Sequence, residues 1–222
     1  MIMSEWEIIW QSRDIFLKGL GNTALLFALS FTGAFLIGCM VNYFLDRGLL
    51  VRQACRLYMS VMRMVPFLVL VYLIYYGLPQ YGIRVDAWTA GAIALAIYHG
   101  AYFAEILRGS RLTLPMGQVE SAKAHGFRPL SMYLHIILPQ LLFRSRPLIG
   151  NQMIYAMKDT SFLSIITVQE LTAAANTVQA SYFIPTKAFI VTIAFYVVLS
   201  MLMDVGLKRA GTHGVQRGFE HA

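Results

Sequence analysis

Long uncharged apolar stretches alternate along the chain with shorter segments that hold most of its charged residues. A helix that rises about 1.5 Å per residue needs roughly 20 residues to cross the hydrocarbon core of a bilayer. Stretches of that length are predicted as five membrane-spanning helices, at residues 22–45, 57–78, 88–107, 147–169 and 186–206. The pattern therefore predicts an all-α, polytopic membrane protein with five transmembrane helices.

Two stretches depart from this simple pattern. Residues 129–143 lack Lys, Arg, Asp and Glu, but at about 15 residues, with Pro139 among them, they are too short to cross a bilayer. We expect this stretch to stay on one side, between the third and fourth spans. The fourth span is interrupted near its middle by Lys158 and Asp159.

Composition supports the membrane assignment. Of the 222 residues, 58% are hydrophobic and 13% are charged, whereas a soluble domain has roughly 45–50% apolar and about 25% charged residues. So few charges cannot cover a soluble core. In a soluble chain, the net charge of +7 would suggest a nucleic-acid partner. No such partner is expected here, because most basic residues lie in the segments that connect or flank the membrane spans.

The placement of Lys and Arg predicts the orientation in the membrane. The positive-inside rule assigns the more basic loops to the cytoplasm. Residues 46–63, 108–146 and the C-terminal tail hold 13 of the 18 basic residues. We therefore expect the N-terminus on the outer side of the membrane, and the C-terminus and the segment at 108–146 in the cytoplasm.

Within that cytoplasmic segment, residues 113–139 carry signals for two short helices. Pro115 suits the first turn of a helix, and Gly126 suits the end of one. A second helix is expected to start near Pro129 and to end near Pro139. Glu120 is expected early in the first helix, where the helix dipole favours a negative charge.

The same residues form a known pattern. Glu120-Ser121-Ala122, three residues, Gly126, nine residues and Ile136-Ile137-Leu138-Pro139 resemble the signature of ABC (ATP-binding cassette) importer permeases. In that family the pattern begins Glu-Ala-Ala, so Ser121 is the departure, and it is also small. The resemblance implies that these residues form coupling helices that insert into a groove on an ATPase subunit. The implied coupling residues are Glu120, Ser121, Ala122, Gly126, Leu138 and Pro139.

Other runs narrow the resemblance to permeases for polar amino acids and opines, of the histidine and glutamine type. They are residues 75–79, 101–109, 117–118 and 158–162, and the likeness covers roughly 15–208. It implies a transport subunit rather than an enzyme, located in the bacterial inner membrane with a periplasmic N-terminus and a cytoplasmic C-terminus. The implied partners are two ABC ATPase subunits that hold ATP and Mg²⁺, a second permease subunit and a periplasmic substrate-binding protein. No cofactor is expected on this chain.

The resemblance also divides the chain. Residues 21–208 are expected to form the transmembrane domain, and 209–222 a cytoplasmic tail. Residues 1–20 are expected to form a periplasmic-side amphipathic segment, with Trp6 and Trp10 on the membrane surface or packed against the first span.

Two elements inside the spans are candidates for the substrate path. The first is Lys158, Asp159, Thr160 and Ser161, because charged groups in a bilayer cost at least about 2.5–3.5 kcal/mol each and usually face a cavity. A Lys–Asp pair that merely locks the packing is the equal alternative.

The second element is Arg63-Met64-Val65-Pro66, where the family usually has Arg-Gly-Thr-Pro. Its loss of Gly and Thr puts direct substrate contact in doubt and slightly favours a heterodimer, in which a sister subunit keeps those contacts. Arg63 as a positive-inside residue and Pro66 as a helix kink are the simpler interpretations. Glu105 and Arg108, three residues apart, are expected to form a surface pair.

A different class of function remains open at this point. An ion-gradient-driven transporter or channel could use Lys158 and Asp159 as a relay. The sequence shows no catalytic constellation and no phosphate-binding glycine loop, and Cys39 and Cys55 lack metal-ligand spacing. If ATP drives transport, another chain must hydrolyse it.

Overall fold

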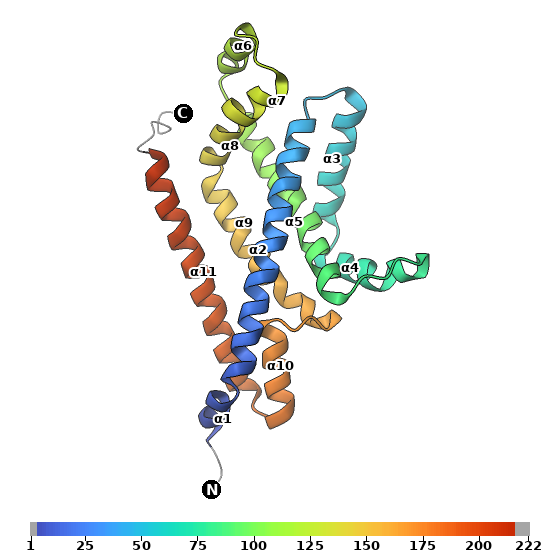
Figure 1. Ribbon diagram of the computed structural model, residues 1–222, viewed down its shortest axis with the longest axis vertical. Helices are drawn as coiled ribbons and strands as arrows, with labels where there is room; N and C mark the ends of the chain where they lie inside the picture. The colour runs from blue at the N-terminus through green and yellow to red at the C-terminus, as the bar shows by residue number, and fades with distance from the viewer. Residues whose placement is uncertain (1–3, 216–222) are drawn as a thin grey trace. The chain divides into compact units, whose positions relative to one another are not determined.

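The computed structural model describes residues 4–215, and the side chains of residues 4–209. This part of the chain is helical and without strands, as predicted (Figure 1). The α-helices are α1 (Glu5–Gln11), α2 (Arg13–Phe44), α3 (Leu49–Met64), α4 (Phe67–Tyr72), α5 (Ala87–Arg111), α6 (Met116–Ala124), α7 (Pro129–Met132), α8 (Leu138–Arg144), α9 (Arg146–Asp159), α10 (Leu171–Tyr182) and α11 (Pro185–Val215). Short π-helical segments occupy Leu73–Gly77 (η1) and Tyr133–Ile137 (η3), and 3-10 segments Leu78–Tyr81 (η2) and Thr160–Ile166 (η4).

Helices α2, α5 and the Pro185–Arg209 part of α11 are long and apolar enough to cross a membrane. A fourth span results if α3 and Phe67–Tyr81 count as one broken span. The expected fourth span, 147–169, consists of α9, with 14 residues, followed by η4. A polytopic helical architecture is thus confirmed, whereas the count of five spans stays a prediction.

The expected second span, 57–78, is wrong as a single helix. α3 begins earlier, at Leu49, and ends at Met64. Val65 and Pro66 then adopt extended backbone, with ψ angles of 131° and 132°. Proline lacks an N–H and disfavours helical backbone in the residue before it. Pro66 therefore caps the start of α4 instead of kinking a continuous helix.

The chain's contacts divide it into two compact units. Of the described residues, unit 1 contains 4–32, 66–95 and 154–202, and unit 2 contains 33–65, 96–153 and 203–215. Helix α2 begins at Arg13, so part of the expected N-terminal segment 1–20 continues into the first span. Residues 1–3 of that segment and 216–222 of the expected tail lie outside the described residues.

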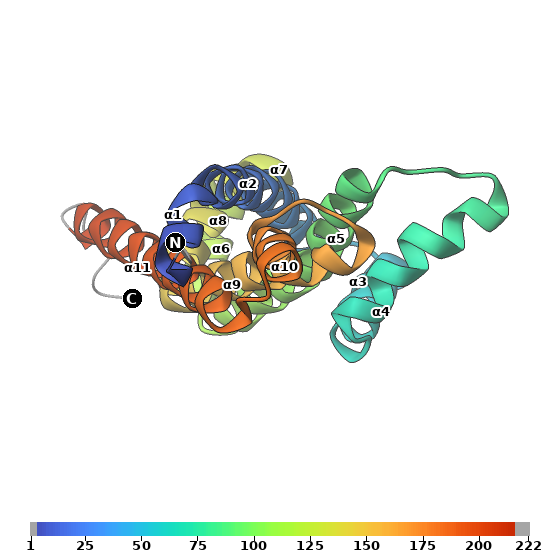
Figure 2. The same ribbon diagram turned by 90° about the horizontal axis from the view of Figure 1, so that it is seen from below.

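Unit 1 has its core where α1, α2, α10 and the start of α11 meet (Figure 2). Helix α10 was not predicted from the sequence, because 170–185 reads as a connection between spans. It packs closely on α2: a Cβ added at Gly19 would lie 3.0 Å from the Ala174 Cβ and 3.1 Å from the Glu170 carbonyl oxygen. Trp6 and Trp10 are exposed while Ile9 joins the core, which agrees with an amphipathic α1.

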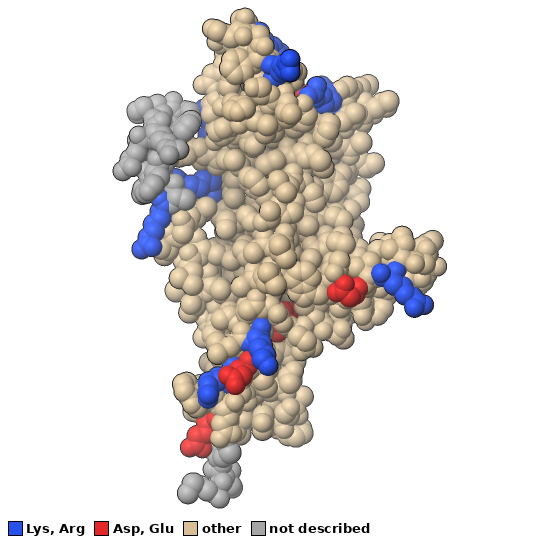
Figure 3. Space-filling view, viewed as in Figure 1, with Lys and Arg blue, Asp and Glu red and all other residues tan. Residues whose placement is uncertain are grey.

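Unit 2 has an apolar core between α2, α3 and α5, formed by Val41, Leu45, Met59 and Ala104. The Tyr58 hydroxyl donates to the Ile97 carbonyl at 2.6 Å and links α3 to α5. On the face in Figure 3, basic side chains of unit 2 gather near α6, near the α2–α3 turn and along the end of α11. The long helices expose few charges on that face, as the sequence pattern predicts.

The α2–α5 contact in unit 2 depends on Gly38. A Cβ at this position would lie 2.5 Å from the Phe103 Cβ and 3.1 Å from the Ala104 nitrogen. We expect Gly38→Ala to destabilise the protein by about 1–3 kcal/mol through overpacking. Thermal unfolding in detergent measures this, and Gly21→Ala on the same helix is the control, because nothing lies within 4 Å of its added Cβ. Equal unfolding temperatures for the two variants would contradict the close α2–α5 contact.

Candidate functional site

The first helix of the segment 113–139, which we call the coupling segment, is α6. It begins after Pro115 and ends at Ala124, with His125 as its C-cap and Gly126 directly after it, close to the bounds that the sequence predicts. The Gly126 N–H donates to the Lys123 carbonyl at 3.0 Å and the Phe127 N–H to the Ala122 carbonyl at 3.1 Å. This pair of bonds is a Schellman motif, which requires left-handed backbone at the residue after the cap. Gly126 provides it, with φ of +75°.

The second helix differs from the prediction. It starts at Pro129 but continues through η3 into α8 and ends at Arg144, beyond Pro139. Pro139 lies in the first turn of α8, where its missing N–H costs little. The π-helical turn before it lets the Leu138 N–H donate to the Tyr133 carbonyl, and the Gln140 side chain donates to the Ile136 carbonyl at 2.8 Å.

The implied coupling residues separate by exposure. Glu120, Ser121 and Gly126 are exposed, whereas Ala122 is only 5% exposed and Leu138 and Pro139 are half-buried. Glu120 is the fifth residue of α6 and lies outside its first turn. The expectation that the helix dipole favours Glu120 there is therefore wrong, because the dipole acts only within the first and last turns.

An apolar cluster anchors the coupling segment to the ends of α2 and α5. Its buried members are Leu107, Tyr133, Ile137 and Leu141, and Cys39 and Tyr43 pack against it. The Tyr133 hydroxyl donates to the Cys39 carbonyl at 2.8 Å. Burial raises the pKa of the Tyr133 phenol, so the hydroxyl keeps the proton that it donates. Sequence reasoning missed Tyr133, whose one signal is an aromatic residue within the second short helix.

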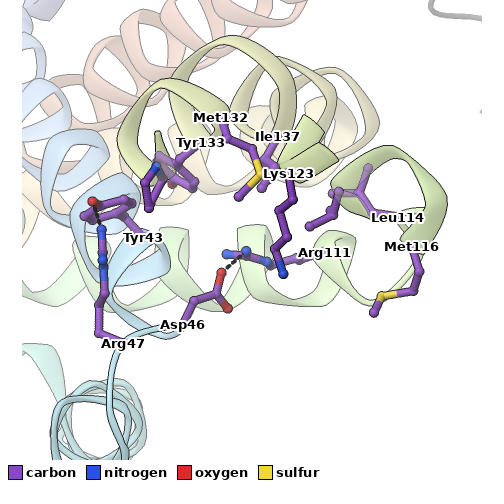
Figure 4. A pocket seen from close by; sticks show the side chains of 12 residues that line it. Tyr43, Asp46, Arg47, Arg111, Leu114, Met116, Lys123, Met132, Tyr133 and Ile137 are labelled. Carbon is purple, nitrogen blue, oxygen red and sulfur yellow. Dashed lines mark hydrogen bonds and ion pairs between the residues drawn. The ribbon is translucent and has the colours of Figure 1, made fainter. Parts of the chain in front are cut away.

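Two hollows adjoin α6 within unit 2. One, of about 390 Å³, lies beside the exposed small residues and is lined by Gly117, Ser121, Ala122 and His125, among others. The other, of about 410 Å³, lies between α6, η3 and the ends of α2 and α5 (Figure 4). The coupling segment therefore has an exposed side with a shallow hollow and an anchored side over a charged cavity.

Arg63 faces Glu105 rather than standing alone. Its Nη1 lies 3.6 Å from Glu105 Oε1, and its Nε donates to the Met59 carbonyl at 3.0 Å. Arg108 makes two hydrogen bonds to the same carboxylate, at 3.0 and 2.6 Å. The predicted Glu105–Arg108 pair is thus confirmed and extended, since it ties the end of α3 to α5.

The residues 158–161 straddle the end of α9 and the start of η4. Lys158 is exposed, Asp159 and Ser161 are half-buried, and Thr160 is fully buried. The Thr160 hydroxyl donates to the Met157 carbonyl at 2.6 Å. Within unit 1, the start of α4 after Pro66 lies beside these residues, because the rings of Phe67 and Phe162 meet edge to face with their centres 6.2 Å apart.

Glu170 is a buried carboxylate that sequence reasoning missed. It caps the start of α10 by accepting from the Thr172 and Ala173 N–H groups at 2.8 and 2.7 Å. The Tyr196 hydroxyl of α11 donates to it at 2.9 Å. The available signal is its position as the sole acidic residue between Asp159 and Asp204.

Sequence reasoning also missed a buried pair in unit 2, in which Gln152 Nε2 lies 2.7 Å from His99 Nδ1.

Among the described residues there is no group of three or more His, Cys, Asp or Glu that could hold a metal ion. The expectation that this chain binds no cofactor stays a prediction.

Comparison with known proteins identifies the family. Residues 34–209 match the model of the binding-protein-dependent transport system inner membrane component. The chain belongs to this family. Its members are integral membrane transport subunits rather than enzymes, and they act with ATPase, substrate-binding and permease partners.

Individual relatives of this permease support the family assignment. A probable glutamine ABC transporter permease protein of Bacillus subtilis (strain 168) is 30% identical over 91% of this chain and 94% of its own length. The glutamine transport system permease protein of Escherichia coli (strain K12) is 30% identical over 92% of this chain and 95% of its own length. An octopine transport system permease protein of Rhizobium radiobacter is 34% identical over 67% of this chain and 64% of its own length.

Solved structures share the fold. The crystal structure of an amino acid ABC transporter with histidines aligns with a TM-score of 0.83 and 29% identity, over 96% of this chain and 100% of that one. The MetNI methionine ABC transporter in an inward-facing conformation aligns with a TM-score of 0.74 and 16% identity, over 95% of this chain and 99% of that one. At that lower identity the likeness concerns the fold alone.

Substitution at Gly126 tests the end of α6. We expect Gly126→Val to disrupt the Schellman motif, because left-handed backbone costs a side-chain-bearing residue about 1–2 kcal/mol. Amide hydrogen exchange around Gly126 and Phe127 should become roughly tenfold faster. Gly109→Ala, at an open helical position of α5, should leave that exchange unchanged. Protection that persists in Gly126→Val would show that the motif does not hold the helix end.

The Glu170 cap allows a second test. We expect Glu170→Ala to lower the free energy of unfolding by about 1–3 kcal/mol, because two N–H groups and the Tyr196 hydroxyl lose their acceptor. Tyr196→Phe should cost less, and the double variant should cost less than the sum of the two. Glu5→Ala, which removes an exposed pair with Lys187, is the control at about 0–1 kcal/mol. Denaturant unfolding in micelles measures all four, and additive effects would argue against the shared bond.

Proposed function

We propose that this chain is the permease subunit of an importer that carries polar amino acids, or opines, into the cytoplasm. Transport is driven by ATP hydrolysis on two separate ATPase subunits, which hold ATP and Mg²⁺. The observation that carries the proposal is α6, whose small exposed residues stand on a helix anchored to α2 and α5. The amino-acid assignment is supported by the relatives named for glutamine and octopine transport.

The exposed side of α6 is the proposed ATPase contact. Glu120 and Ser121 are available to a partner, and the hollow beside Ser121 can accept a partner side chain. Leu138 and Pro139 act on the other side, where they hold the helices against the bundle. Ala122 is nearly buried and lines the hollow beside Ser121, and Gly126 sets the angle between the two helices. A shift of the ATPase surface would thus move α6 and, through the Tyr133 cluster, the ends of α2 and α5.

The proposed orientation places unit 2's coupling segment in the cytoplasm and α1 on the periplasmic side of the inner membrane. The basic residues of the α2–α3 turn and of the coupling segment support it. A periplasmic binding protein delivers the substrate. Residues 21–208 form the transmembrane domain, α1 belongs to the N-terminal segment, and the tail from residue 209 lies in the cytoplasm.

The substrate path is proposed to pass the region of Lys158, Asp159 and Ser161, next to Pro66 and the start of α4. Thr160 is fully buried and bonds to Met157, so its role is to shape the turn after α9. Arg63 is engaged by Glu105, which supports a structural role for it. A second permease subunit with its own substrate contacts would complement this chain, so we favour a heterodimer.

Site-directed crosslinking tests the ATPase contact. In a chain with Cys39 and Cys55 replaced by Ser, we expect Ser121→Cys to crosslink to the ATPase subunit in membranes, because Ser121 is exposed on α6. Ala122→Cys is the matched control, since the neighbouring position is only 5% exposed and should crosslink weakly. Glu120→Lys should abolish ATP-driven uptake while membrane insertion persists.

The contrary outcome is equally clear. A Ser121→Cys chain that never captures the ATPase, together with normal uptake by Glu120→Lys, would exclude the proposed docking role of α6.

A further inference from the structure

The cavity on the anchored side of α6 has no role in the transport scheme above. It lies within unit 2, has a volume of about 410 Å³, and is enclosed by the end of α2, the end of α5, α6 and the α7–η3 turn. Figure 4 shows the Lys123 and Arg111 side chains extending into the same space from different helices. The cavity is therefore shaped jointly by the coupling segment and by the two helices that anchor it.

Its charged groups are mostly basic. Arg47, Arg111 and Lys123 line it together with one acid, Asp46. Arg111 pairs with Asp46 and donates to the Asn42 carbonyl at 3.3 Å. These four side chains leave two positive charges in excess.

The basic groups are held to different degrees. The Arg47 guanidinium lies 4.5 Å from the centre of the Tyr43 ring and donates to its hydroxyl, so it is fixed in place. The Arg111 side chain is 20% exposed and is held by Asp46, which is 58% exposed. The Lys123 ammonium forms no ion pair or hydrogen bond with the described residues, and it has three donors to offer. Lys123 is thus available to bind an anion together with the arginines of the lining.

The rest of the lining is apolar. Leu114, Val119, Met132 and Ile137 line the cavity and belong to the cluster that anchors the coupling segment. A free phosphate ion makes no use of such a surface, whereas the glycerol and upper acyl carbons of a phospholipid do. Basic pockets at the cytoplasmic ends of transmembrane helices are suited to lipid head groups.

We propose that this cavity binds the phosphate group of an anionic phospholipid of the cytoplasmic leaflet. Lys123 and Arg111 contact the phosphate oxygens, Arg47 completes the basic rim beside Tyr43, and the glycerol end lies against Met132 and Ile137. The inference rests on the orientation given under the proposed function. A bound lipid joins α6 to the ends of α2 and α5, so the anionic lipid content of the membrane sets how firmly the coupling helix is held.

The test uses the permease purified with its ATPase subunits in a neutral detergent and titrated with short-chain phosphatidylglycerol. Native mass spectrometry measures the bound lipid. We expect Lys123→Gln to weaken binding about fivefold, the effect of one basic group near an anionic head group. Arg56→Gln is the matched control, because Arg56 is an exposed basic residue of α3 in the same unit that does not line the cavity. It should bind the lipid as the wild type does.

Several results would overturn the inference. They are equal binding of short-chain phosphatidylcholine, equal losses in Lys123→Gln and Arg56→Gln, and displacement of the lipid by orthophosphate at the same concentration, which would indicate a site for free phosphate. Lipid binding by the isolated permease but not by the complex would show instead that an ATPase side chain fills the cavity.

The outcome is separable from the proposed function. ATP-driven uptake by the wild-type complex, measured in parallel, tests the transport role without reference to the cavity. Intact uptake with no preference for phosphatidylglycerol rejects only the lipid site, whereas a lack of uptake rejects the transport role whatever lipid is bound.

Discussion

The contact between the coupling segment and the ends of α2 and α5 is the interaction on which the functional account depends. Tyr133, Ile137 and Leu141 bury against Leu107 of α5, and the Tyr133 hydroxyl bonds to the backbone of α2. Close-packed groups transmit displacement because they cannot be compressed. A force on α6 therefore reaches two membrane-spanning helices through a few buried side chains. Without that contact, the exposed Glu120 and Ser121 would belong to a loose loop.

Backbone conformation gives the coupling segment the shape that the proposed docking role requires. Gly126 lets α6 end abruptly, and the π-helical turn at Tyr133–Ile137 lets the following helix accept Pro139 and continue to Arg144. Together, these two backbone features give the coupling segment an exposed side and a buried side. In unit 1, the Glu170 cap has a comparable structural role, because it fixes α10 against α11 through Tyr196.

The sequence predicted the features that depend on local chemistry. The apolar runs around α2, α5 and α11, the start of α6 at Pro115 and its end at Gly126 all follow from composition or from single residues, and the resemblance led to the right family. Features that depend on tertiary contacts were missed. Helix α10 is too short for a span, and the residues at its helical spacing, Leu171, Ala174, Ala175 and Val178, include two alanines, which give a weak apolar signal. The link from Glu170 to Tyr196 joins residues that are far apart in the sequence. The complete break at Pro66 exceeded the expected kink because Val65 is also extended.

Transport in a defined membrane tests the central claim most directly. The permease, its ATPase subunits and the cognate binding protein are reconstituted in proteoliposomes with all ion gradients collapsed, and uptake of a labelled polar amino acid is measured with and without ATP. The account predicts uptake that requires both ATP and the ATPase subunits. Uptake by this chain without the ATPase, driven by an imposed proton or sodium gradient, would contradict it.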